Sequence, residues 1–302
     1  MAGGNILTYK KTILITGSNA GIGFITAKHA ALAKHRVILA CRSMPKAEKA
    51  KQEILQLDPN ADVWIRPLDL GSFDSIRKFA ETIERDFPVV DALVNNAGIY
   101  PMSEEYTAEG FEMQFGVNYL GHFLLSHLLL PVLSKAPAAR IVHVSSVGHM
   151  MGNIKPNTFR GRKLYLWGMP AYGQSKLANV MLSNELSRRL PVNMTSNAVH
   201  PGYVDSDFFR NIPGFIYKAL RKFLVSAEFS GKHIQEMAVA DGWNNRTGEF
   251  ISSQGPLPKS RKLNDLKLSN WLYEESCRLT GVEPVDAEKL TRSANLEAST
   301  LS

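Results

Sequence analysis

The feature that most constrains the fold is a glycine-rich turn between a short apolar segment and a helix near the N-terminus. Residues 11–16 are mostly aliphatic and β-branched, as in a strand buried inside a parallel sheet. Gly17, Gly21 and Gly23 follow directly, and residues 24–33 form an apolar segment of helical composition. A strand, a tight turn and a helix in this order begin a βαβ unit, so the chain is predicted to build an α/β sheet.

The same turn predicts a bound nucleotide. Glycines let the backbone turn tightly and approach a pyrophosphate, and the N–H groups at the start of a helix bind its charge. A tight turn without a ligand is the alternative. The spacing is Gly-x-x-x-Gly-x-Gly, which differs from the commoner Gly-x-Gly-x-x-Gly fingerprint.

Strand and helix patterns alternate along most of the chain. No linker-like break interrupts them, so we predict one domain over residues 1–284, a doubly wound parallel sheet (Rossmann fold) with a C-terminal substrate lid. The tail, 285–302, is small and polar and is expected to be disordered. Further strands are predicted at 36–40, 63–68, 91–94, 140–145, 193–199 and 249–252, and helices at 46–57 after Pro45, at 72–87 with Ser72 as N-cap, at 108–133 and at 171–189.

Composition sets outer limits on the function. The chain has 302 residues, of which 44% are hydrophobic, enough for a sizeable core. Cys41 and Cys277 form neither a metal-ligand spacing nor a disulfide framework, which favours a reducing compartment. The net charge is +7, but the basic clusters are short and lack interleaved aromatics, so nucleic acid is not a predicted partner. The basic excess suits a phosphate-bearing cofactor or contact with anionic membranes.

No segment reads as a membrane span. Residues 1–10 contain no apolar run of the kind found in signal peptides. The longest apolar run, 123–133, is too short to cross a bilayer and contains His127 and Pro131. We therefore expect a cytoplasmic protein, with peripheral membrane contact left open.

Tyr172 and Lys176 lie four residues apart, one turn of a helix, so their side chains share a face. A positive charge beside a phenol lowers its pKa and suits it to exchange a proton with a carbonyl or alcohol oxygen. An ordinary solvated helix face has the same spacing, so the pair needs support from other motifs.

That support comes from three more motifs in a fixed order. Together with Tyr172 and Lys176, the segments 16–23, 95–98 and 144–146 resemble the motifs of short-chain dehydrogenases/reductases. The likeness runs from about Lys11 to Gly281. The chain is most similar to the retinol dehydrogenase branch of that family, through the segments 39–42, 118–123, 175–179 and 200–202.

The resemblance implies a role for each polar residue of the reacting centre. Tyr172 is the proton donor or acceptor, and Lys176 lowers its pKa and holds the nicotinamide ribose. Ser146, rather than its neighbour Ser145, donates a hydrogen bond to the reacting oxygen. Asn118 holds a water beside the lysine.

Cys41 and Arg42 follow the second predicted strand, where NAD-binding folds carry a carboxylate, so NADP(H) is favoured over NAD. Lys46 is a second candidate for the phosphate. Asp69 either contacts the adenine or starts the following helix. Asn95 either lines the cofactor or braces the sheet. No metal is expected. The cofactor-binding residues implied by the resemblance are Gly17, Ser18, Asn19, Gly21, Ile22, Gly23, Arg42, Lys46, Asp69, Leu70, Asn95, Ala97, Gly98, Tyr172, Lys176, Pro201, Gly202, Val204 and Ser206.

Two apolar segments point to the substrate. Residues 207–225 are rich in Phe, Ile and Leu and suit a substrate lid, with core packing as the alternative. The stretch 147–171 is long for the family and is also apolar. We predict an oxidoreductase acting on a bulky lipophilic carbonyl or alcohol such as a retinoid or steroid. A non-catalytic NADP(H) sensor and a carbon–carbon double-bond reductase are the alternatives.

Relatives in this family often dimerise through the helices that correspond to 123–133 and 177–186, and those with long C-terminal extensions include monomers. We therefore expect a homodimer, with a monomer as the alternative.

Overall fold

The computed structural model describes residues 9–161, 165–202 and 226–300. Its strands form one seven-stranded, fully parallel sheet in the order β3-β2-β1-β4-β5-β6-β7. The predicted doubly wound α/β fold is confirmed. The strands are β1 Thr12–Thr16, β2 Arg36–Cys41, β3 Val63–Pro67, β4 Ala92–Asn95, β5 Ala139–Val144, β6 Met194–His200 and β7 Phe250–Ser252.

The central strand β1 is buried on both faces. Alternate side chains of a strand point to opposite sides, and Leu14 packs into one hydrophobic cluster while Ile13 and Ile15 pack into the other. β1 pairs with β2 on one side and β4 on the other, so the strand order reverses beside it. Ligands of doubly wound sheets bind at the carboxyl ends of strands at such a reversal.

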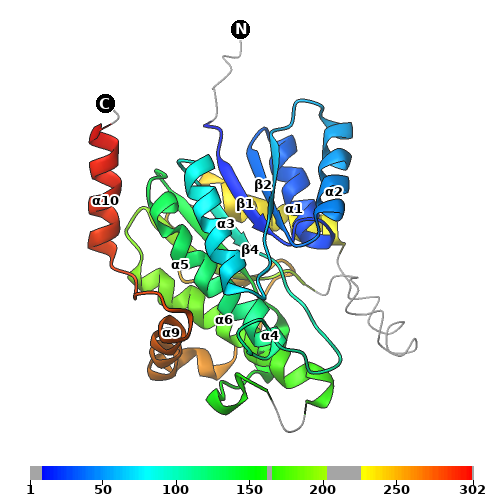
Figure 1. Cartoon of the computed structure of the whole chain (residues 1–302), viewed down its shortest axis with the longest axis vertical. Coiled ribbons are helices and arrows are strands. Elements are labelled where there is room, and N and C mark those ends of the chain that lie inside the picture. The colour runs from blue at the N-terminus through cyan, green and yellow to red at the C-terminus, as the bar shows by residue number, and fades with distance from the viewer. Residues whose placement is uncertain (1–8, 162–164, 203–225, 301–302) are drawn as a thin grey trace.

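Helices cover both faces of the sheet (Figure 1). The helices α1 Gly21–Leu32, α2 Met44–Leu57 and α8 Ala227–Val239 contribute to one cluster, and α3 Phe73–Asp86, α5 Gly121–Ser134 and α6 Met169–Arg189 contribute to the other. The predicted starts of α2 and α3 are confirmed. Pro45 lies in the first turn of α2, and the Ser72 side chain accepts a 3.3 Å hydrogen bond from the Ser75 N–H.

The helix predicted over 108–133 begins five residues later and is irregular. After α4, Met113–Phe115, the chain makes a π-helical turn, η1 Gly116–Leu120, and then continues as α5. The Glu112 carboxylate caps the start by accepting hydrogen bonds from Gln114 and Phe115 N–H groups. A π turn alters the spacing of side chains within a helix and is common at functional sites.

The continuous helical stretch Met113–Ser134 is long and apolar enough to cross a membrane by length and composition. However, 89% of its apolar window is buried inside the protein. Burial of this kind is what a core helix of a globular fold shows.

The C-terminal region is ordered into helices, in contrast to the predicted disordered tail. Helix α9, Leu266–Thr280, ends at Gly281 in the left-handed conformation, and α10 spans Ala287–Thr300. Val285 and Leu290 pack against the main hydrophobic cluster. One face of α10 is exposed and polar. The polar composition of the region therefore gave no sign of its few packing residues.

Helices α9 and α10 pack beside α6 and α5 (Figure 1). As a result, none of the side chains of residues 177–186 is exposed. Among residues 123–133, only the side chain of Pro131 is exposed. The homodimer expected through these two helices would need a face that the same chain already covers, so the monomer alternative fits this part of the fold.

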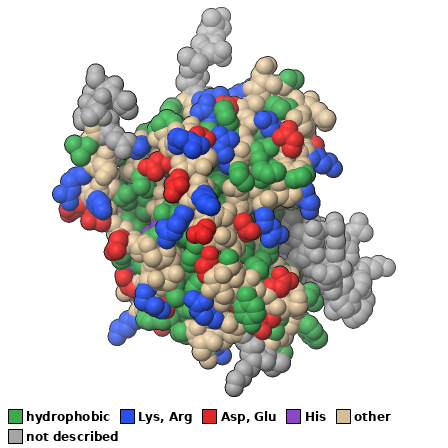
Figure 2. Space-filling view, viewed as in Figure 1, with side chains coloured by type: hydrophobic (Ala, Val, Ile, Leu, Met, Phe, Trp, Pro, Cys, Tyr) green, Lys and Arg blue, Asp and Glu red, His purple; other side chains and the backbone are tan. Residues whose placement is uncertain are grey.

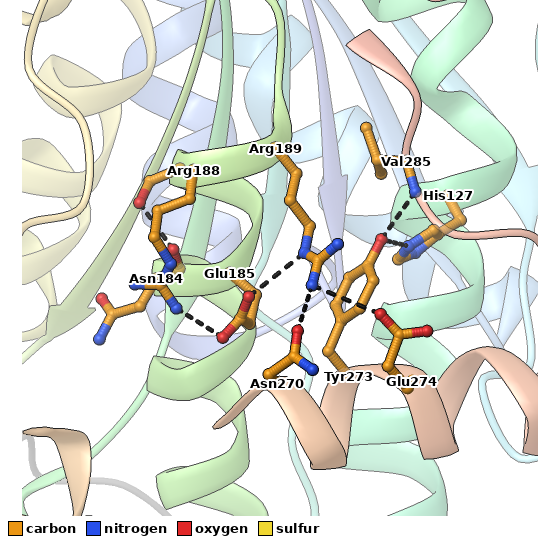
Figure 3. Close-up of polar contacts among 10 residues, drawn as sticks. His127, Asn184, Glu185, Arg188, Arg189, Asn270, Tyr273, Glu274 and Val285 are labelled. Carbon is orange, nitrogen blue, oxygen red and sulfur yellow. Dashed lines mark hydrogen bonds and ion pairs between the residues drawn. The ribbon is translucent and has the colours of Figure 1, made fainter. Parts of the chain in front are cut away.

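A polar network fastens α9 to the body of the protein (Figure 3). The guanidinium of Arg189, from α6, lies 4.2 Å from the ring centre of Tyr273 and donates to Glu185 and Asn270. The Tyr273 hydroxyl accepts from the Val285 N–H and lies 2.9 Å from His127 Nε2. His127 Nδ1 donates to a backbone carbonyl, so Nε2 accepts the Tyr273 proton.

Tyr273→Phe should therefore lower the free energy of unfolding by about 1–3 kcal/mol, because it removes the partner of the part-buried Val285 N–H and of the buried His127 Nε2. Urea unfolding measures the loss, and hydrogen exchange should show a faster Val285 amide than in the wild type. Unchanged exchange at Val285 would contradict the role assigned to this hydroxyl.

Candidate active site

The predicted site residues come together at the carboxyl ends of β1, β4 and β5. The glycine turn follows β1, residues 95–100 follow β4, and Ser146 follows β5. Tyr172 and Lys176 approach from α6, and Asn118 from the π turn η1. The sheet therefore gathers motifs that are up to 160 residues apart in the chain.

The side chains of Ser146 and Tyr172 come together beside Gly148, where a Cβ would lie 3.5 Å from Ser146 Oγ and 2.9 Å from Tyr172 Cε1. The Ser146 oxygen accepts a 3.1 Å bond from the Gly148 N–H, which fixes the hydroxyl. Ser145 points the other way and donates to the Lys176 carbonyl at 2.8 Å. The two serines thus diverge as strand alternation predicts, and only Ser146 faces the tyrosine.

Gly148 is a residue that sequence reasoning missed. A Cβ at this position would lie 2.9 Å from Cε1 of the Tyr172 ring, so glycine lets the phenol approach Ser146 closely. On another side, Tyr100 packs edge-on against Tyr172 with ring centres 5.3 Å apart. The phenol is therefore held between a glycine and a second aromatic ring.

The pKa of Tyr172 is raised above its ordinary value, mainly by burial, while the hydrogen bond with Ser146 lowers it. The expectation that Lys176 lowers this pKa is not met. The Lys176 ammonium lies 5.7 Å from the ring centre of Tyr172 and donates instead to the Val144 carbonyl at 3.1 Å. Its own pKa is lowered to about 8 because it is buried.

Asn118 braces the segment after β4, using both ends of its side chain. Its oxygen accepts from the Ile99 N–H at 2.8 Å, and its amide donates to the Ile99 carbonyl and the Ser175 hydroxyl. A Cβ on the adjacent Gly98 would lie only 3.3 Å from Lys176 Nζ. Asn118 therefore positions the backbone beside the lysine, and the water that it is expected to hold there stays a prediction.

Thr16 and His122 form a second polar link that the motifs did not reveal. The Thr16 oxygen accepts from the Asn96 and Ala97 N–H groups, at 3.0 and 2.9 Å. His122 Nδ1 donates to the Asn118 carbonyl, so its Nε2 accepts from the Thr16 hydroxyl at 2.9 Å. His122 lies one helical turn after Asn118, and that spacing is the signal that could have identified it.

The glycine turn has the geometry of an anion-binding loop. Gly17 and Gly21 have φ of +64° and +57°, which disfavour other residues. A Cβ at Gly23 would lie 2.4 Å from the Asn96 amide nitrogen and 2.6 Å from the Gly17 carbonyl oxygen. At Gly21 a Cβ would meet no atom within 4 Å, so the backbone there faces open space at the start of α1.

Arg42 and Lys46 are exposed just beyond the end of β2. In the part of the chain that the structure describes, neither forms an ion pair. A phosphate could approach both without displacing a carboxylate.

Three other candidates have local structural roles. Ser18 is buried and donates its hydroxyl to the Ile15 carbonyl, which leaves its backbone for a ligand. Asp69 accepts from the Gly71 N–H at 2.9 Å and so shapes the start of α3. Asn95 donates to Ser126 at 2.9 Å and is buried, as the sheet-bracing alternative expects.

The remaining candidates differ in how much the structure says of them. Pro201 and Gly202 are buried after β6, where the Pro201 carbonyl accepts a hydrogen bond from Ser230. Val204, Ser206 and the predicted lid over 207–225 lie outside the described residues. Asn19, Leu70 and Ala97 lie in the loops that follow β1, β3 and β4, and Ile22 lies in the first turn of α1.

Comparison with known proteins then decides the family. Residues 11–214 match the family model described as short chain dehydrogenase. The chain belongs to the short-chain dehydrogenase family. The resemblance to the retinol dehydrogenases is confirmed, and members of this family are oxidoreductases that use NAD(P)(H) and act on alcohol or carbonyl groups.

Among the relatives of this short-chain dehydrogenase, retinol dehydrogenase 12 from Mus musculus is 37% identical and the match covers 92% of this chain and 89% of the relative. Retinol dehydrogenase 13 from Homo sapiens is 38% identical, covering 90% and 85%. A solved structure of an uncharacterised protein from Mycobacterium paratuberculosis has 32% identity and a TM-score of 0.74, covering 91% and 95%. The RhlG/NADP active-site complex from Pseudomonas aeruginosa has 25% identity and a TM-score of 0.65, covering 80% and 94%.

Three buried histidines, two near the site and His127 in the α9 network, predict how stability depends on pH. Burial lowers the pKa of His122 and His127 to about 4 and, together with the charge of His122, that of His143 to about 3. An unfolded histidine titrates near about 6.5. Between these values the unfolded chain binds protons that the folded chain does not, so stability falls as pH falls from 6.5 to 4.

We expect each such histidine to contribute a slope of at most about 1.4 kcal/mol per pH unit in that range. Urea unfolding at a series of pH values gives the proton uptake on unfolding. The variant His122→Gln should take up about one proton fewer than the wild type. An identical uptake would show that His122 is not buried in its neutral form.

Proposed function

We propose that this short-chain dehydrogenase transfers a hydride between NADP(H) and the carbonyl or alcohol of a bulky apolar substrate, with Tyr172 as general acid/base. The observation that carries the proposal is that the Ser146 hydroxyl and the Tyr172 ring meet beside Gly148, near Lys176 and at the reversal of strand order. A hydroxyl and a phenol that converge at this place can both donate to one substrate oxygen.

The nicotinamide, when bound, supplies or accepts the hydride. Tyr172 gives its proton to the carbonyl oxygen during reduction, and its raised pKa keeps that proton in place at neutral pH. Ser146 donates a hydrogen bond to the same oxygen as negative charge develops on it. Lys176, with a pKa of about 8, is mostly protonated at pH 7 and donates to the Val144 carbonyl beside the site, where it could hold the nicotinamide ribose.

The residues present suit an NADP(H) cofactor. The open backbone at Gly21 and the start of α1 suit a pyrophosphate. Arg42 and Lys46, exposed beyond the end of β2, suit a 2′-phosphate, and no carboxylate stands between β2 and Lys46. The structural neighbour RhlG, described as an NADP complex, supports the same choice.

A retinoid- or steroid-like substrate is supported by the relatives named retinol dehydrogenases. Part of the apolar stretch before Tyr172 is not available to a substrate, because Ile154 and Phe159 are buried in the main hydrophobic cluster. A cytoplasmic location agrees with Cys41 and Cys277, which are free and buried.

Tyr172→Phe should lower kcat for carbonyl reduction by about 10²–10⁴-fold, because the proton donor is lost while the ring stays. The assay follows NADPH consumption with a panel of apolar aldehydes and ketones. Tyr100→Phe is the matched control, since it removes a neighbouring phenol hydroxyl and should keep turnover. Full turnover in Tyr172→Phe would refute the proposed acid.

Arg42→Glu should raise KM for NADPH by about 10–100-fold, because a charge-assisted pair with the 2′-phosphate becomes a repulsion. The KM for NADH should change far less. Lys49→Glu, an exposed charge reversal on α2 nearby, is the control and should leave both values near those of the wild type. A wild-type enzyme that prefers NADH would overturn the cofactor assignment.

A further inference from the structure

Five large apolar side chains are exposed around the start of α6, which carries Tyr172. We call this set the apolar rim. Trp167 is the most exposed of them, at 74%. The apolar rim consists of Met102, Met150, Met151, Leu166 and Trp167.

The backbone of three segments brings these side chains to one place. A Cβ at Gly168, directly after Trp167, would lie 2.8 Å from the Pro101 carbonyl oxygen, directly before Met102. A Cβ at Gly173, in the second turn of α6, would lie 3.1 Å from the carbonyl carbon of Met151. In Figure 1 the start of α6 lies at the bottom of the molecule, at the end opposite to both chain termini.

The segment that carries the most exposed rim residue, Trp167, is also conformationally strained. Leu166 and Trp167 have φ of +48° and +53°, a region that bulky residues rarely adopt. Such strain persists where the surrounding structure enforces it and is common at functional surfaces. Burial does not explain it here, since both side chains are more than half exposed.

Two loops beside the rim have basic residues and no acidic ones among the described residues. The loop 147–161 has Lys155 and Arg160, and the loop 253–264 has Lys259, Arg261 and Lys262. The acidic residues nearest to the rim in the sequence, Glu104 and Glu105, follow Met102. The two loops adjoin, since the Ser260 N–H donates to His149 Nε2 and Lys262 donates to the Gly152 carbonyl.

Elsewhere the charges are mixed. On the face drawn in Figure 2, acidic and basic side chains are interspersed over the surface. Beside the rim, Lys155, Lys259 and Arg261 are exposed. Within the described residues none of these three forms an ion pair.

We propose that the apolar rim and the two basic loops form a docking surface for an anionic lipid bilayer. A tryptophan and sulfur-containing side chains suit the boundary between headgroups and acyl chains, while lysine and arginine attract acidic headgroups. Resting on the proposed function, this surface brings the start of α6, and hence Tyr172, to the membrane in which an apolar substrate dissolves.

The test is co-sedimentation of the full chain with vesicles of phosphatidylcholine alone or mixed with phosphatidylserine. The protein should bind the mixed vesicles and bind the neutral ones much less. Trp167→Ser, and separately the double variant Lys259→Glu/Arg261→Glu, should each weaken binding by about tenfold or more. Trp167 emission should shift to shorter wavelength on binding, and this shift should be absent in Trp167→Ser.

Matched controls come from the far part of the fold. Trp64, on the edge strand β3, is also exposed, and Trp64→Ser should leave vesicle binding unchanged. The double variant Lys49→Glu/Lys78→Glu reverses two exposed charges on α2 and α3 and should do the same. Thermal melting of every variant separates loss of binding from loss of folding.

Equal binding to both kinds of vesicle, or binding that Trp167→Ser leaves intact, would overturn the proposal. The latter result would indicate a general polyanion surface. Turnover is measured separately with a small water-soluble aldehyde. The double variant Lys259→Glu/Arg261→Glu should convert this aldehyde to its alcohol at the wild-type rate. If no carbonyl is reduced while the lipid binding holds, the proposed function fails and the docking surface stands.

Discussion

The Thr16 hydroxyl is the interaction on which the geometry of the site depends. It lies at the end of the central strand, accepts two backbone N–H groups from the segment after β4, and donates to His122. His122 in turn holds the Asn118 carbonyl in the π turn. One buried oxygen therefore joins the glycine turn, the Asn96–Ala97 backbone and the helix that braces Gly98. Because Thr16, His122 and Asn118 are buried, a shift in one of them would leave a polar group unpaired, and the site is held as one unit.

The sequence predicted the sheet, its helices and the approach of Ser146 to Tyr172, because these follow from local patterns. Aliphatic runs, the glycine spacing and the one-turn spacing of Tyr172 and Lys176 need only neighbouring residues. What it missed depends on tertiary contacts. The pKa of Tyr172 is set by burial between Tyr100 and Gly148, and the ammonium of Lys176 is held by a carbonyl of β5. The π turn and the helical C-terminal region likewise form through packing that no periodicity records.

The site combines fixed and adaptable parts. Asn118, Asn95 and Ser18 have hydrogen bonds that tie loops to the scaffold, so they support the site from behind. Arg42, Lys46 and the backbone at Gly21 face outward, where a ligand can meet them. This division explains why motif residues of one family have different physical roles. Some can contact the ligand, and others hold those residues in position.

The packing of α9 and α10 onto α6 and α5 has a consequence for how the protein behaves on dilution. An enzyme that buries such helices against a second subunit loses structure when its concentration falls below the dissociation constant. Here the covering surface is tethered to the same chain and fastened by Tyr273, Val285 and His127. The effective concentration of that surface is fixed by the chain itself. The two core helices therefore stay covered however scarce the protein is, and its local fold is independent of its abundance.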